Sequence, residues 1–141
     1  MNQFLDLITQ LADLNPAICR ALPVKAPGYF AVGIGREPVE IDSTQPSNFD
    51  LMCGGEAIKQ DIVRRGWGVL IRTNRDDSSW TVRINARGYK FRHPLKQDSL
   101  FSHQLKECEG TGEHDAIALL DAYCRCLKYL EQAQKEENWH E

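Results

Sequence analysis

Hydrophobic and polar side chains alternate in three short runs within residues 67–93. The runs cover residues 67–72, 80–85 and 89–93. Alternation with a period of two is typical of β-strands, in which successive side chains point to opposite faces. The links at residues 74–79 and 86–88 are too short to cross a sheet face and predict antiparallel hairpins. The pattern therefore predicts a three-stranded meander with one aromatic and aliphatic face and one mostly cationic face.

Three other segments repeat hydrophobic residues every three or four positions, which is typical of amphipathic helices. They predict helices at residues 2–14, from between 48 and 55 to residue 65, and from 113 to about 135. Gly66 directly follows the second segment and predicts its C-cap. Asn15 and Pro16 predict a new helical turn through Leu22.

The remaining segments carry weaker signals. We expect a fourth strand at residues 28–34, a loop at 36–47 with a short extended piece at 39–41, an irregular segment at 94–112 with a helical turn around 100–108, and a frayed tail at 136–141. The apolar sheet face needs helices to cover it. The predicted fold is therefore α+β, with an antiparallel three- to four-stranded meander packed by helices in a single domain of residues 1–141.

The same pattern predicts which residues form the core. From the sheet they are Trp67, Val69, Ile71, Trp80, Val82, Ile84 and Phe91, and from the helices Ile58, Ile62, Ile117, Leu120, Cys124 and Leu127. The five cysteines (Cys19, Cys53, Cys108, Cys124 and Cys126) form no CxxC pair and have apolar neighbours. We predict that they are reduced thiols buried in the core.

The composition is that of an ordinary globular domain. The chain has 141 residues, of which 42% are hydrophobic and 26% are charged. Its first nineteen residues contain no Lys or Arg, and no apolar run approaches the roughly twenty residues that span a membrane. These features predict a cytoplasmic protein without a membrane partner.

Basic residues are concentrated around the predicted meander. Residues 64–96 contain nine Lys or Arg and two Asp, a net charge of +7, whereas the remaining residues carry −10 and the whole chain −3. Like charges on neighbouring strands repel unless anions lie between them, and guanidinium groups suit contact with phosphate or carboxylate. We therefore predict a surface for an anionic partner, whether protein, nucleic acid or nucleotide. Its residues are Arg72, Arg83, Lys90 and Arg92, enlarged by Arg65, Arg75 and Arg87.

The alternative is that the protein balances these cations itself. Acidic residues such as Glu107, Glu109 and Glu113, or the second subunit of a homo-oligomer, would then lie against the basic strands. The predicted aromatic residues lie on the core face, whereas a surface that stacks nucleic-acid bases interleaves aromatic and basic side chains. Both interpretations of the basic face stay open at this point.

No motif in the chain specifies a reaction, a metal site or a cofactor. His93, His103, Cys108 and His114 lack the tight spacing of zinc ligands, and the glycine pairs fit no phosphate-binding loop. We expect a protein that is not an enzyme, with no metal and no cofactor. The alternative is a small phosphoester hydrolase that uses a cluster of His103, Cys108 and His114.

The order of elements resembles a known family. A helix that ends in Arg65-Gly66, a strand at residues 68–72, a strand that opens on Trp80 (WTVRI) and a helix of the form DAIALLDAYCRCL resemble the phage helix–sheet–helix (ABA) sandwich domains, over about residues 48–130. The resemblance implies an accessory protein of a phage or mobile element. The resemblance assigns no role. An accessory protein that binds an anionic partner through the basic face could be an inhibitor of a host system or a sponge that sequesters a nucleotide.

Overall fold

The computed structural model describes residues 2–22, 27–34, 37–76, 78–86 and 106–139, and the structural statements below concern these residues. In chain order the elements are α1 (Gln3–Leu14), β1 (Cys19–Ala21), β2 (Tyr29–Ile34), β3 (Glu37–Asp42), α2 (Asn48–Arg65), β4 (Gly68–Thr73), β5 (Trp80–Ala86), β6 (Lys106–Gly112) and α4 (Asp115–Trp139). The strands form two antiparallel sheets, in the orders β1-β2-β3 and β4-β5-β6. The predicted α+β class is confirmed.

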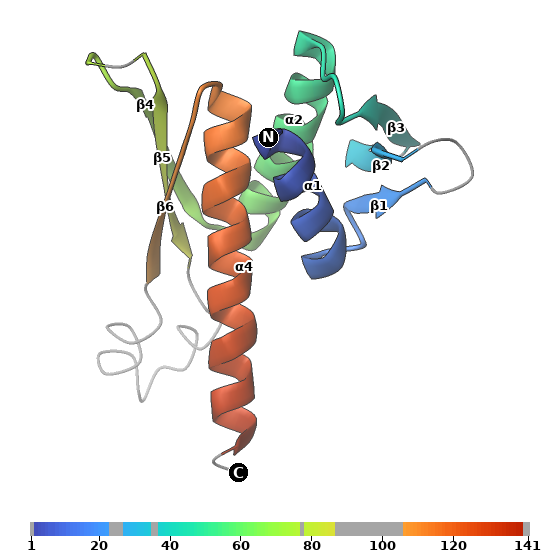
Figure 1. Ribbon diagram of the computed structural model, residues 1–141. Coiled ribbons are helices and arrows are strands. Elements are labelled where there is room, and N and C mark those ends of the chain that lie inside the picture. The colour runs from blue at the N-terminus through green and yellow to red at the C-terminus, as the bar shows by residue number, and fades with distance from the viewer. Residues whose placement is uncertain (1, 23–26, 35–36, 77, 87–105, 140–141) are drawn as a thin grey trace.

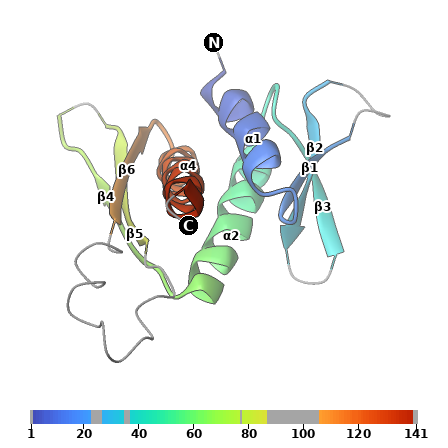
Figure 2. The same ribbon diagram turned by 90° about the horizontal axis from the view of Figure 1, so that it is seen from below.

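The helices lie between the two sheets (Figures 1 and 2). Figure 2 shows the β4–β5–β6 sheet, then α4, then α2 and α1, and then the β1–β2–β3 sheet. Helix α4 packs along β5 and β6, while α1 and α2 pack between α4 and the other sheet. The strand predicted at residues 28–34 exists as β2, but it belongs to this second sheet and does not extend the meander.

Local sequence signals account for the two helices that precede the meander. The side chain of Asn2 caps α1 by accepting a hydrogen bond from the Leu5 amide at 3.2 Å. At the start of α2, Ser47 and Asp50 form a reciprocal capping box. Gly66 ends α2 with a φ of 74°, the left-handed conformation that glycine adopts without strain. The predicted C-cap is confirmed.

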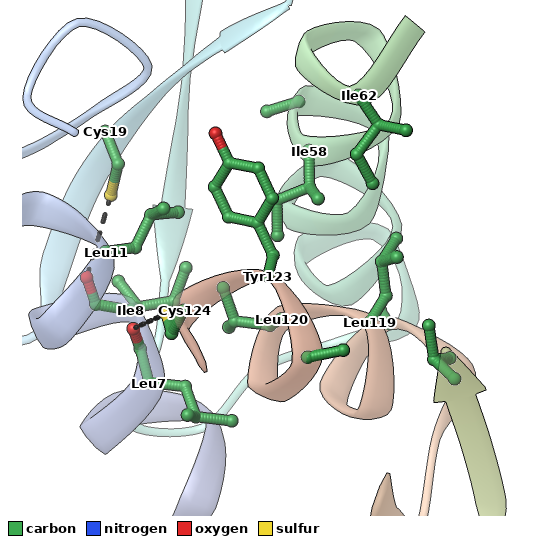
Figure 3. Close-up of a cluster of buried hydrophobic side chains, with 14 of the residues drawn as sticks. Leu7, Ile8, Leu11, Cys19, Ile58, Ile62, Leu119, Leu120, Tyr123 and Cys124 are labelled. Atoms are coloured by element: carbon green, nitrogen blue, oxygen red, sulfur yellow. Dashed lines mark hydrogen bonds between the residues drawn. The ribbon is translucent and has the colours of Figure 1, made fainter. Parts of the chain in front are cut away.

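The core is centred on one side of α4 (Figure 3). Leu119, Leu120, Tyr123 and Cys124 are fully or almost fully buried against α1 and α2. The thiol of Cys124 donates to the Leu7 carbonyl at 3.7 Å, and that of Cys19 donates to the Ile8 carbonyl at 3.8 Å. Burial raises the pKa of each of these two thiols to about 12. All five cysteines are buried and free, which confirms the prediction of buried thiols.

The third strand of the meander is β6, in a segment that we expected to be irregular. Its residues alternate between the two faces of the sheet, with Cys108, Gly110 and Gly112 on the side of α4. Glycine occupies that face because the α4 backbone lies so close that a side chain at Gly110 would overlap Ala118 and Ala122. The helical turn predicted around residues 100–108 is wrong at residues 106–108. The strand predicted at residues 89–93 lies outside the described residues.

Two N-terminal predictions are also corrected. Residues 19–21 form β1 instead of a helical turn, because Cys19 pairs with Val32 of β2 and its side chain is buried. The extended piece expected at residues 39–41 exists, but it is part of a longer strand, β3, which covers residues 37–42 of the expected loop and pairs with β2 along its whole length. Its Pro38 is tolerated because β3 is an edge strand of this sheet. At the other end, α4 continues to Trp139, into the predicted frayed tail.

Candidate functional site

The cationic face of the predicted meander is the face of the β4–β5–β6 sheet that points away from α4. Val82 and Ile84 of β5 are buried against α4, so Arg83 between them points to the opposite side. The register places Arg72 opposite Thr81 and Leu70 opposite Arg83, so these side chains share that side. We call this side the outer face. It consists of Gly68, Leu70, Arg72, Thr81, Arg83, Asn85, Glu107, Glu109 and Thr111.

Two glutamates of β6 balance the charge of Arg83. The Nε atom of Arg83 lies 3.1 Å from Glu109 Oε2 and 3.4 Å from Glu107 Oε1. Glu107 and Glu109 are among the residues expected to neutralise the basic strands from within, and they do so for this arginine. The outer face therefore carries two guanidinium groups and two carboxylates. Arg72 is exposed and has no ion-pair partner among the described residues.

The other predicted surface residues are distributed differently. Arg65 lies at the end of α2, where its Nε donates to Asp61 Oδ2 at 2.7 Å and its guanidinium stacks 4.9 Å from the centre of the Trp67 ring. It is therefore engaged within the protein. Arg75 is exposed in the turn between β4 and β5. The remaining three members of the set, Arg87, Lys90 and Arg92, lie outside the described residues.

The carboxylate of Asp61 is buried between α2 and α4, with 3% of the residue exposed. Burial alone would raise the pKa of Asp61, but hydrogen bonds from the Tyr123 hydroxyl and from the guanidinium groups of Arg65 and Arg64 outweigh it and hold the pKa below its usual value. The Asn15 amide donates to the Tyr123 oxygen at 3.1 Å and extends the network to the end of α1. The carboxylate thus bonds to Tyr123 of α4 and to two arginines of its own helix.

Strand β4 is much more exposed than its sequence predicts. We expected Val69 to be buried, but 42% of it is accessible, and 58% of Leu70 is accessible on the outer face. The reason is that α4 lies across β5 and β6 and leaves β4 at the edge of the sheet. Trp67, Val82 and Ile84 are buried as predicted, and Ile71 and Trp80 are partly buried. Phe91 lies outside the described residues.

A pocket of about 90 Å³ lies beside β4, where α2 and the start of α4 meet the sheet. Its apolar lining includes Met52, Ile71, Ala116 and Leu119, and its polar lining consists of Glu56, Lys59, His114 and Asp115. Met52 is 65% exposed although it is apolar. Sequence reasoning missed this apolar surface. The signal available was the run Val69-Leu70-Ile71, which is apolar at three successive positions instead of alternating.

The structure does not bring the residues of the proposed hydrolase cluster together where it describes them. Cys108 is buried on the α4 side of β6 opposite Ile84. His114 lies two residues beyond Gly112, whose Cα is about 13 Å along the strand from that of Cys108 at the usual rise per residue. His103 lies outside the described residues. No group of three or more His, Cys, Asp or Glu within the described ranges is arranged to hold a metal ion.

No described helix is both long enough and apolar enough to span a membrane. Comparison of the chain with protein-family models, curated proteins and solved structures found no match. The resemblance to phage helix–sheet–helix proteins therefore stays a prediction.

Proposed function

We propose that this chain is a small, non-enzymatic accessory protein of the phage or mobile-element type, acting in the cytoplasm, and that it binds an acidic partner protein through the outer face beside β4. The observation that carries the proposal is that an exposed guanidinium, Arg72, and an exposed aliphatic side chain, Leu70, are neighbours on this face. An inhibitor of a host system is the role that fits such a protein.

A protein partner fits this surface better than a nucleic acid does. Affinity for nucleic acid comes mainly from neutralising successive phosphates, which requires several cations without competing carboxylates. Here Glu107 and Glu109 form ion pairs with Arg83 and would repel a phosphate backbone. Arginine next to exposed apolar side chains is typical of protein interfaces instead.

A nucleotide is also a weaker candidate than a protein partner. Small-molecule sites usually enclose about 300–1,000 Å³. The pocket beside β4 has about 90 Å³ and a partly apolar lining. A volume of that size accommodates one side chain of a larger partner, so the pocket supports a macromolecular contact.

The burial and hydrogen bonding of two potentially reactive groups support the proposal that the protein is not an enzyme. Cys108 is buried in the core, and Asp61 has its hydrogen-bonding capacity satisfied by Tyr123, Arg64 and Arg65. A nucleophile or a general base has to reach its substrate. A binding protein needs no accessible reactive group. Its effect should require a molar amount equal to that of its partner.

The charge dependence of binding tests this proposal. Wild type and Arg72→Glu are titrated with a fluorescent acidic peptide of alternating Glu and Val residues, with single-stranded DNA and with ATP, at low and high salt. We expect the peptide to bind best, to bind more weakly at high salt, and to lose affinity by at least about tenfold on Arg72→Glu, since a charge-assisted contact is lost and a repulsion gained.

The matched control is Arg20→Glu. Arg20 is an exposed arginine on β1 of the other sheet, so this variant has the same change of net charge at a distant place. It should bind the peptide as wild type does. Preference for DNA or ATP, or equal peptide affinities of Arg72→Glu and Arg20→Glu, would contradict the proposal.

A further inference from the structure

The outer edge of β4 has backbone hydrogen-bonding groups that its neighbour does not use. The Asn74 amide donates to the Ser79 carbonyl at 2.8 Å, directly after the end of β4. Hydrogen-bonded and non-hydrogen-bonded pairs alternate along an antiparallel ladder. The even-numbered residues of β4 therefore bond to β5, whereas Val69, Ile71 and Thr73 direct their N–H and C=O groups away from it. Among the described residues, no strand pairs with this edge.

Little on this edge would prevent β4 from pairing with another strand. Edge strands are usually protected by charged side chains, especially lysine, by proline, by a bulge or by a covering helix or loop. Strand β4, with the sequence GVLIRT, has no proline and no lysine, its one charged residue is Arg72, and its register with β5 is continuous from Gly68 to Thr73. An apolar edge with so little protection is a template for another strand.

The two sides of the edge differ in chemistry. On the α4 side, Ile71 lines the pocket together with Met52, Ala116 and Leu119. On the outer side, Leu70 and Arg72 are exposed. A strand added at this edge would place alternate side chains over the pocket and over the outer face. Apolar side chains fit the first position, and an acidic side chain fits the second, next to Arg72.

We propose that the partner contributes an extended segment that pairs with the free edge of β4 as a fourth strand. In this segment, apolar residues facing the pocket alternate with residues on the outer side, of which the one next to Arg72 is acidic. Backbone hydrogen bonds to Val69, Ile71 and Thr73 supply affinity, and the pocket and Arg72 supply specificity. The inference rests on the proposed function and narrows it from an acidic protein to an acidic, extended segment.

The test begins with peptides selected on the wild-type protein from a displayed random library. The selected peptides should share a period of two, with apolar residues at alternate positions and acidic residues between them. A helix docked in the pocket would instead select apolar residues at spacings of three and four. Such spacing, or the absence of any common pattern, would overturn the proposal.

The selected peptide is then titrated with Val69→Pro and Val69→Ala. Proline removes the amide on the free edge but none of the bonds to β5, and the preceding Gly68 has no Cβ to clash with the proline ring. Alanine truncates the same side chain and keeps the amide. We expect Val69→Pro to weaken binding by at least about tenfold and Val69→Ala by less than about threefold. Equal effects would overturn strand pairing.

N-methylated peptides provide a measurement that does not depend on the folding of a variant. Methylation of the alternate amides that face β4 should abolish binding to the wild-type protein, whereas methylation of the other set should leave most of it. Similar effects of both sets would overturn the proposal. Sedimentation of the protein alone identifies a different occupant: a dimer that Val69→Pro dissociates would mean that β4 pairs with a second copy, which also overturns it.

These results separate the two proposals. Peptide binding that needs Arg72 but is unaffected by Val69→Pro keeps the proposed function and removes strand pairing. Peptide binding that is unaffected by both Arg72→Glu and Val69→Pro removes strand pairing and the proposed function.

Discussion

The hydroxyl of Tyr123 should be an important source of stability, and Tyr123→Phe tests this. Tyr123 has no exposed surface and donates to the buried carboxylate of Asp61 across the contact between α4 and α2. It also accepts the hydrogen bond from Asn15. Phenylalanine keeps the ring, and with it the contact to Trp67 at 6.2 Å between ring centres. The substitution therefore removes the polar interactions and almost nothing of the packing.

The magnitude follows from the two lost hydrogen bonds. A hydrogen bond to a charged group contributes about 1.5–3 kcal/mol, and a neutral one about 0.5–1.5 kcal/mol. Arg64 and Arg65 still donate to Asp61 in the variant, so the carboxylate is not left unpaired. The amide of Asn15 loses its acceptor, and this residue is close to fully buried. We expect the free energy of unfolding to fall by about 2–4 kcal/mol.

Urea unfolding followed by tryptophan fluorescence measures this change. The matched control is Tyr29→Phe, which removes a hydroxyl from a partly exposed tyrosine of β2 and should change the free energy by less than about 0.5 kcal/mol. The double variant with Asp61→Asn should show a coupling energy of about 1–3 kcal/mol between the two positions. A cost of Tyr123→Phe no larger than that of the control would refute the reasoning.

Two further predictions concern Asp61 and Gly110. Because its hydrogen bonds outweigh burial and lower the pKa of Asp61, its stabilisation is fully present above about pH 3.9, the usual pKa of aspartic acid, and is lost as the pH falls through the lower pKa of the folded state. Urea unfolding at a series of acidic pH values should therefore show a flatter decline for Asp61→Asn than for wild type, and parallel curves would refute this assignment. Gly110→Ala should destabilise the protein by about 3 kcal/mol or more, because the added methyl overlaps the backbone of Ala118 and Ala122. Gly68→Ala, whose methyl would lie 3.9 Å from the Asn85 side chain, is the control in thermal unfolding, and equal midpoints would show that β6 does not pack against α4 as described.

The sequence alone was sufficient for the elements with a strong local period. The helical repeat predicted α1, α2 and most of α4, and Gly66 correctly marked the end of α2. Strict alternation predicted β5 with its inward Val82 and Ile84. These properties depend on residues a few positions apart, so they can be predicted without knowing which distant segments pack against them.

Strand β6 was missed because two of its inward positions, Gly110 and Gly112, are glycines, which the close approach of α4 requires and which form no apolar pattern. The sequence also could not show that β2 belongs to a second sheet, since pairing with β1 and β3 depends on contacts that a period does not encode.

Part of the candidate site was likewise predicted from the sequence, and part was decided only by the tertiary structure. Alternation placed Arg72 and Arg83 on the outer face, and acidic residues such as Glu107 and Glu109 were considered as their partners. Only the tertiary structure decided that β6 sets these glutamates beside Arg83 and that no strand of the described residues pairs with the outer edge of β4. It also joined Asp61 to Tyr123, 62 positions away in the chain. The physical reason is that a period determines which face a side chain occupies, whereas the charge and burial of that face depend on which distant segment packs next to it.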